Sequence, residues 1–193
     1  MHKKILIAAA AAVVSCGGSS WVDPTTGNFS AQDSAEVMGM LSSGMSAIAR
    51  QPAQQLPLQN SKALTESVSN QVSCAVSGTV TVNGSVDSSC NSAGTSCNFS
   101  GNLSVLFDQC TTQNGLKGNG GLYATASGSE TSSGNVTTFS VPEHIWGGIT
   151  VVRASDSSTI GTCGINVTAT VSSDGTTETV HVSGTVCKQA VAQ

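Results

Sequence analysis

The stretch of the sequence from Pro142 to Gly148 brings together an acid, a base and an aromatic side chain. Glu143 adjoins His144, and Trp146 is followed by two glycines. A carboxylate beside an imidazole can exchange protons, and an aromatic ring next to unconstrained backbone can help to hold a ligand. We expect Glu143, His144 and Trp146 to lie in a loop between two strands. This loop either binds a ligand or is an ordinary connector in which Trp146 covers a sheet end.

The rest of the chain offers little for catalysis. His181 lies between Val180 and Val182, a pattern that predicts a solvent-facing strand position. The sequence contains no serine-hydrolase elbow, no zinc-protease helix motif and no phosphate-binding loop. A hydrolase that used His144 would therefore lack a nucleophile. We expect a non-enzymatic protein with no catalytic residues and no cofactor.

The amino terminus has the pattern of an export signal. Met1 to Lys4 is basic, and an apolar run follows from Ile5 to Val14. A helix of this length spans about 15 Å, roughly half of a hydrocarbon core of about 30 Å. The run is therefore too short to cross a membrane, and it fits the apolar region of a signal peptide.

The end of this run, Val13-Val14-Ser15-Cys16, resembles the signal of bacterial lipoproteins, in which an aliphatic and a small residue precede a cysteine. The resemblance implies a signal peptide over residues 1–15 and acylation of Cys16, which would anchor the mature chain to a lipid bilayer. Gly17, where an Asp would retain the protein, implies sorting to the outer membrane, facing the periplasm or the cell surface. An ordinary secretory signal with an incidental Cys16 is the alternative.

The charge balance excludes one class of partner. Of 193 residues only 9% are charged, and 7 Lys and Arg stand against 11 Asp and Glu, a formal net charge of −4. Nucleic-acid binding depends on clustered cations that neutralise phosphates, and this chain has none. We expect no nucleic-acid partner.

Six further cysteines follow Cys16 along the chain. An even number of cysteines in an exported protein predicts three disulfides, whereas a zinc site would need Cys-x2-Cys or His-x3-His spacing, which the sequence lacks. We therefore expect disulfides and no metal. The six are Cys74, Cys90, Cys97, Cys110, Cys163 and Cys187.

The hydrophobic pattern divides the mature chain into an anchor and linker (16–29), a helical segment (30–70) and a β-domain (71–193), with 30–193 as one folding unit. Ser30 and Asp33 have the spacing of a helix-capping box. Apolar residues then recur every three or four positions, which predicts one buried helix face. A shorter second helix is expected over 60–69. The residues of the apolar face are Val37, Met38, Leu41, Met45 and Ile48.

From Gln71 onward the period changes to two, which indicates half-buried strands. About seven such strands predict a mainly β protein, an antiparallel meander. We expect a strongly curved sheet with the helix against its concave side, and a sandwich as the alternative. Asp174-Gly175 marks the last hairpin turn.

The hairpins also predict the disulfide pairing, because opposed residues in an antiparallel pair share a nearly constant sum of residue numbers. With Asp174-Gly175 as the turn, Cys163 falls within one residue of Cys187. With Val86 opposite Cys97, Cys74 falls within one residue of Cys110. We predict the pairs Cys74–Cys110, Cys90–Cys97 and Cys163–Cys187.

These observations favour a non-enzymatic lipoprotein of the bacterial envelope with a structural or surface-interaction role, and an envelope protein as a candidate partner. The alternative is a carrier of an apolar, acyl-type ligand held between the helix and the sheet. In that case the methionine-rich helix face would line a cavity and would not be part of a filled core.

Overall fold

The computed structural model describes residues 22–49, 64–133 and 136–192. Within these ranges one helix and eight strands are present, and the strands form a single antiparallel sheet in chain order. The predicted antiparallel meander is confirmed, with eight strands in place of about seven. The elements are α1 (Ala31–Ala49), β1 (Leu64–Ser73), β2 (Ser77–Cys90), β3 (Ser96–Thr111), β4 (Leu116–Ser133), β5 (Val136–Arg153), β6 (Thr159–Ser173), β7 (Glu178–Val186) and β8 (Gln189–Ala192).

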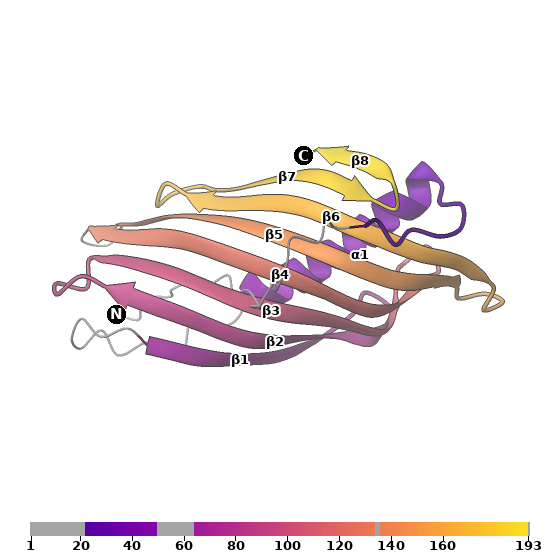
Figure 1. Cartoon of the computed structure of the whole chain (residues 1–193), viewed down its shortest axis with the longest axis horizontal. Coiled ribbons are helices and arrows are strands. Elements are labelled where there is room, and N and C mark those ends of the chain that lie inside the picture. Colours follow the sequence, from indigo (N-terminus) through magenta and orange to yellow (C-terminus); the bar gives the residue numbers. More distant parts are fainter. Residues whose placement is uncertain (1–21, 50–63, 134–135, 193) are drawn as a thin grey trace.

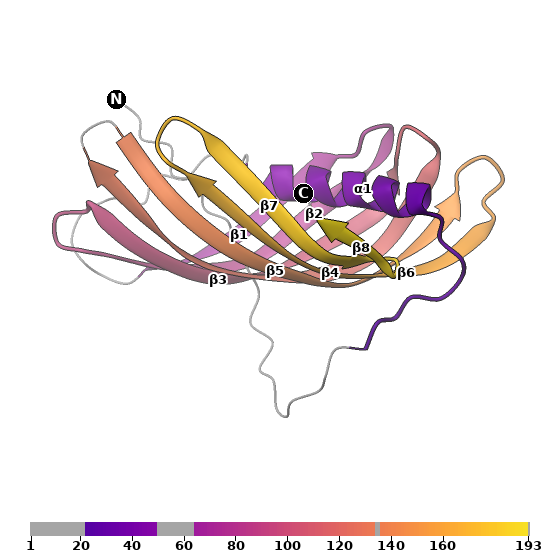
Figure 2. The same ribbon diagram turned by 90° about the horizontal axis from the view of Figure 1, so that it is seen from above.

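The sheet is long and strongly curved. Figure 1 views it from its convex side, with α1 behind the strands. In the view from above, α1 lies along the concave side of the sheet (Figure 2). Since all eight strands belong to one sheet, the curved-sheet arrangement holds and the sandwich alternative does not.

The two faces of the sheet differ because apolar and polar residues alternate along each strand. Leu103 and Val105 of β3 are buried on the concave face, as are Ile165 and Val167 of β6. The residues between them, Ser104 and Asn166, are polar and lie on the convex face. Side chains in a strand alternate between faces, so one face forms the core and the other meets solvent.

The start of α1 is fixed by a capping box. The Ser30 backbone N–H and hydroxyl donate to the Asp33 carboxylate at 2.9 and 2.7 Å, and the Asp33 N–H donates back to the Ser30 hydroxyl at 3.1 Å. Burial alone would raise the pKa of Asp33, but these hydrogen bonds and the charge of Arg153 outweigh it and hold the pKa below its usual value. The predicted helix start is confirmed.

The helix contributes Val37, Met38, Met40 and Leu41 to the same hydrophobic core as the strands. The predicted residues Val37, Met38 and Leu41 are buried as expected, and Met40 joins them. The side chains of Met45 and Ile48 lie outside the described part of the structure. The first half of the helix face is therefore packed core.

The prediction of a helical segment as far as residue 70 is wrong at its carboxyl end. Residues 64–73 form β1, which pairs with β2 over its whole length, Leu64 opposite Ser88 and Ser73 opposite Thr79. Val68 and Val72 are partly buried against the core at strand spacing. Pairing with a neighbouring strand has overridden the local helical preference.

All three predicted disulfides are present. Cys74 pairs with Cys110, Cys90 with Cys97 and Cys163 with Cys187, with Cα–Cα distances of 5.4, 3.9 and 4.5 Å. The register differs in detail from the prediction, because the turn after β6 spans four residues from Asp174 to Thr177. Ile165, not Cys163, therefore lies opposite Val186. The bridge instead reaches Cys187 at the turn into β8.

A segment ahead of the helix, residues 22–29, is fastened to the convex face. The Gly164 N–H donates to the Thr25 hydroxyl at 2.8 Å, and the Thr26 N–H donates to the carbonyl of Thr162 at 2.9 Å. The neighbours of Gly164 in the strand face the concave side, so Gly164 itself faces the convex side. A Cβ atom at this position would meet the side chains of Asp23 and Thr25. From there the segment passes around the end of the sheet to α1 (Figure 2). We call residues 22–29 the N-terminal strap.

Candidate binding surface on the convex face

Strand β5 runs without a break through the stretch from Pro142 to Gly148. Glu143 lies opposite Ala126 of β4 and Ala169 of β6, and His144 lies one position further along the strand. The expectation of a loop here is wrong. Both glycines pair with β4 and β6, and Pro142 pairs with Thr170 of β6, so the strand continues through this stretch. Consecutive residues of a strand point to opposite faces, so Glu143 and His144 are separated by the sheet.

Glu143 is buried on the concave face. Its side chain is only 6% exposed, and its strand neighbours, Ala126 and Ala169, are small apolar residues. Within the described part of the chain the carboxyl group has no hydrogen-bond or ion-pair partner. Burial therefore raises the pKa of Glu143 to about 7, since the charged form loses its solvation.

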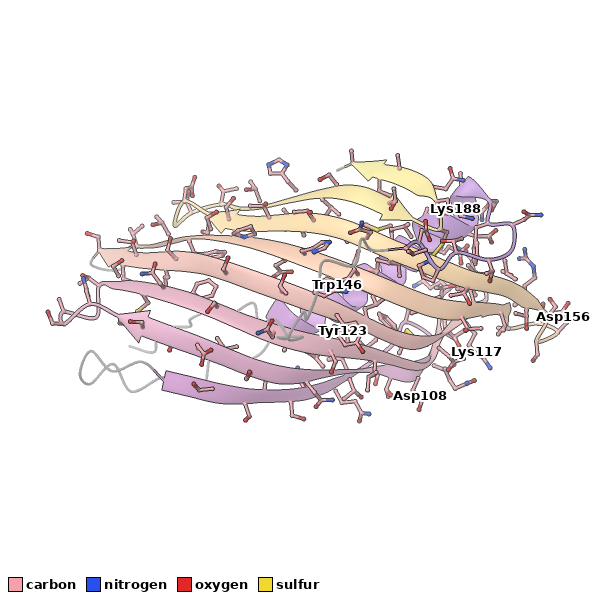
Figure 3. The ribbon with its side chains drawn as sticks, in the orientation of Figure 1. Asp108, Lys117, Tyr123, Trp146, Asp156 and Lys188 are labelled. Carbon is pink, nitrogen blue, oxygen red and sulfur yellow. A yellow bond between two sulfur atoms is a disulfide. The ribbon has the colours of Figure 1, made fainter. Side chains whose placement is uncertain are left out.

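His144 and Trp146 lie on the convex face, with Tyr123 of β4 directly opposite Trp146. The rings of His144 and Trp146 are stacked with centroids 4.8 Å apart, and Tyr123 and Trp146 lie 6.1 Å apart. The His144 Nε2 atom forms a hydrogen bond of 2.7 Å with the side-chain oxygen of Asn166. Figure 3 shows Tyr123 and Trp146 together near the middle of the convex face.

Leu106 of β3 extends this cluster, because it lies diagonally beside Tyr123 across the β3–β4 pair. Leu106 is 47% exposed and Tyr123 is 46% exposed, unusual values for large apolar side chains on a face of small polar residues. We call Leu106, Tyr123, His144, Trp146 and Asn166 the aromatic patch. It combines apolar surface with polar edges, a composition typical of binding surfaces.

A shallow polar hollow of about 400 Å³ adjoins the patch at His144. Its lining residues are Ser100, Gly101, Asn102, Thr125, Ala126, Ser127, Pro142, Glu143, His144 and Thr168, of which Gly101, Ala126 and Glu143 occupy concave-face positions of their strands. Hydroxyl and amide groups can both donate and accept hydrogen bonds, so the hollow suits an uncharged polar group.

The charged side chains of the convex face lie away from the patch. Figure 3 places Asp108, Lys117 and Asp156 toward the end of the sheet where β3 turns into β4 and β5 into β6. No member of the aromatic patch is a lysine, arginine, aspartate or glutamate. The patch is therefore suited to a neutral or amphipathic partner and not to a polyanion.

A second cleft, of about 420 Å³, opens between α1 and two hairpin turns at one end of the sheet. Its walls are Ala35 and Gly39 of the helix, Ala75 of the β1–β2 turn and the β3–β4 turn, and Met40 forms part of the floor. The Thr112 hydroxyl donates to the Glu36 carboxylate at 2.8 Å and ties the helix to the β3–β4 turn. This cleft is open to solvent and lies beside the core, not within it.

Comparisons of the chain with protein-family models, with curated proteins and with solved structures found no match. Among the described residues no cluster of His, Cys, Asp and Glu could hold a metal ion. In the same ranges no helix has both the length and the apolar character needed to span a bilayer. Cys16, the residue on which the lipoprotein resemblance rests, lies outside the described residues.

The structure thus brings two of the three predicted ligand residues, His144 and Trp146, into one surface patch. Glu143 adjoins the neighbouring hollow, but its side chain occupies a position on the other face of the sheet. Sequence reasoning missed Tyr123, Asn166 and Leu106. A signal was present: Tyr123 and Asn166 occupy the polar positions of their alternating strands, where a tyrosine among serines and threonines stands out. Only the register of β4, β5 and β6 shows that they meet.

Proposed function

We propose that the protein is a non-enzymatic lipoprotein of the bacterial outer membrane, anchored through acylated Cys16, whose β-domain acts by binding or as a structural module. The signal pattern Val13-Val14-Ser15-Cys16 supports the anchor. Three disulfides in a chain of low charge support a compartment outside the cytoplasm. An envelope protein is a candidate partner in this role.

One observation carries the non-enzymatic part of the proposal, namely the position of Glu143 and His144 on opposite faces of β5. General acid–base catalysis requires both groups within hydrogen-bond reach of one substrate. Here the Glu143 carboxyl group faces the buried concave side. The His144 imidazole stacks on Trp146 and forms a hydrogen bond with Asn166. The exposed aromatic patch instead offers a preformed surface for a partner.

Carriage of an apolar ligand is the second candidate, and the cleft beside α1 favours it. Its volume of about 420 Å³ falls within the usual range for small-molecule sites, and Ala35, Gly39, Met40 and Ala75 line it. The helix face first expected to line the cavity is packed core in its described half. A ligand would therefore occupy the end of the helix–sheet interface and not its centre.

Fractionation of the native host tests the anchor. The wild-type chain should label with radioactive palmitate and sediment with outer membranes, whereas Cys16→Ser should do neither and should accumulate with its signal peptide intact. Cys187→Ser is the matched control, because it removes a thiol from the disulfide framework and leaves the acylation site. Equal palmitate labelling of the wild type and Cys16→Ser would overturn the proposal.

A further inference from the structure

We propose that the convex face of the sheet rests on the membrane to which the chain is anchored, with Leu106, Tyr123 and Trp146 in the headgroup region. This inference rests on the acylation of Cys16 and goes further, because it assigns an orientation and a contact surface. Its occupant is the bilayer itself. Three features of the molecule support it: the path of the N-terminal strap, the length of chain before it and the composition of the aromatic patch.

The N-terminal strap fixes the side of the sheet from which the chain leaves. Thr25 is buried against Gly164, and the side chain of Pro24 lies where a substituent on Gly148 would be. Both glycines occupy convex-face positions of their strands, since the next residues, Ile149 and Ile165, are buried in the core on the concave face. The residues before the strap therefore start from the convex side.

The connection from this point to the acylated residue is short. Only Gly17 to Trp21 separate Cys16 from Val22. Six Cα–Cα steps of about 3.3–3.6 Å span at most about 22 Å. Because Pro24 lies over Gly148, two positions from Trp146 on the same strand, the acyl chains are tethered close to the aromatic patch. A bilayer that holds these chains cannot lie far from the convex face.

The patch has the chemistry of a membrane interface. Tryptophan and tyrosine are enriched at the level of lipid headgroups, where one part of the ring is apolar and another makes hydrogen bonds. Leu106 and Val22, 47% and 80% exposed, add apolar surface on the same side. A face that bulges outward touches a plane first at its crest. Figure 2 shows the outward curve of the sheet, and Figure 3 places Tyr123 and Trp146 on its middle strands.

The contact between the aromatic patch and the bilayer depends on the acyl anchor at Cys16 and does not replace that anchor. The patch carries no lysine or arginine, so anionic lipid is not required and added salt should not release it. A few exposed side chains do not hold a protein on a bilayer without the acyl chains. Membrane attachment should therefore depend on Cys16, and the orientation of the domain should depend on the patch.

Tryptophan fluorescence can test the orientation directly. The chain has two tryptophans, so Trp21→Phe leaves Trp146 as the sole reporter. The acylated Trp21→Phe protein would be reconstituted into phosphatidylethanolamine and phosphatidylcholine vesicles that carry a nitroxide quencher near the headgroups. We expect about two-fold or stronger quenching of Trp146 and a blue-shifted emission, as for an aromatic ring at the interface.

A matched control moves the reporter to the other face. In Trp21→Phe/Trp146→Phe/Val180→Trp the tryptophan replaces a residue that is 47% exposed and shares its face with the buried Val182. This reporter should show no quenching in the same vesicles. Flotation of both proteins with the vesicles verifies that each is anchored.

Four results would overturn the inference, and the last of them would overturn the proposed function as well. Equal quenching of Trp146 and of the Val180→Trp reporter would show no preferred face. A floating protein with unquenched Trp146 would show that the convex face points away, while the anchor stands. A Trp146 signal that responds to soluble peptidoglycan fragments and not to lipid would make the patch a saccharide site. If the purified protein carries no acyl chain and does not float, the proposed function fails and this inference falls with it.

Discussion

Glu143 and His144, adjacent in sequence on β5, project from opposite faces of the sheet, one buried beside Ala126 and Ala169 and the other stacked on Trp146. The dipeptide that looked like an acid–base pair is therefore two separate features. The buried Glu143 carboxyl group affects how stability depends on pH, and the His144 imidazole is part of the aromatic patch.

Replacement of Glu143 should change how stability depends on pH. The pKa of Glu143 rises from 4.5 to about 7 on folding, so the folded state binds more protons than the unfolded state between these values. The free energy of unfolding should fall as pH rises through this window and remain lower above it, by about 3 kcal/mol. Glu143→Gln should remove this fall and unfold at higher urea concentration than the wild type at about pH 8.

Urea titrations at a series of pH values provide the measurement. Asp108→Asn, which alters an exposed carboxyl on the convex side of β3, is the control and should follow the wild-type profile. A Glu143→Gln protein that loses stability with pH as steeply as the wild type would show that another group is responsible.

The three disulfides should differ in their contribution to stability. The Cys74–Cys110 bridge spans a sequence separation of 36 residues and the Cys90–Cys97 bridge only 7. Loop-closure entropy then predicts losses of about 4 and about 2 kcal/mol when each pair is replaced by alanines. Guanidinium unfolding without reductant would measure both. A larger loss for the Cys90–Cys97 pair would contradict this ranking.

Gly164→Ala should detach the N-terminal strap. A methyl group at this position would lie 2.0 Å from the Asp23 carboxylate and 2.7 Å from the Thr25 hydroxyl. We expect a destabilisation of about 1–3 kcal/mol and fast hydrogen exchange at the Thr26 amide, while the β4 and β5 amides stay protected. Unchanged protection of Thr26 would mean that the strap is not held by this contact.

Gly39→Ala should have the opposite effect on stability. Gly39 lies in the interior of α1, and a methyl group there meets no atom within 4 Å. Alanine should stabilise the protein by about 0.5–1 kcal/mol, because glycine loses more backbone freedom in a helix. Thermal unfolding measures the gain. If the cleft carries an acyl ligand, the same variant should also reduce the amount of lipid that copurifies.

Much of the fold followed from the sequence because it depends on local patterns. The Ser30–Asp33 spacing predicted the helix start, and the alternation from residue 71 predicted the strands. The predicted pairing of Cys163 with Cys187 is correct although the predicted β6–β7 turn was too short. The resulting shift of two residues in the register still leaves the two cysteines adjacent.

The candidate site was less predictable because it depends on contacts across strands. A proline and two glycines suggested a loop after Val141, but pairing with β6 throughout, and with β4 from Glu143 onward, continues β5 through this stretch. The meeting of Tyr123 with Trp146 requires the β4–β5 register, which no local pattern specifies. The strap could not be predicted either, because the bond from Gly164 to Thr25 joins residues 139 positions apart.

Intact mass spectrometry of the mature protein from its own host's envelope tests the central claim most directly, that this is an acylated, disulfide-bonded envelope lipoprotein. We predict a chain that begins at Cys16, carries the added mass of its acyl chains, and is six hydrogens lighter than its reduced form, as three disulfides require. A chain that begins elsewhere, or one that begins at Cys16 without acyl mass, would contradict the account.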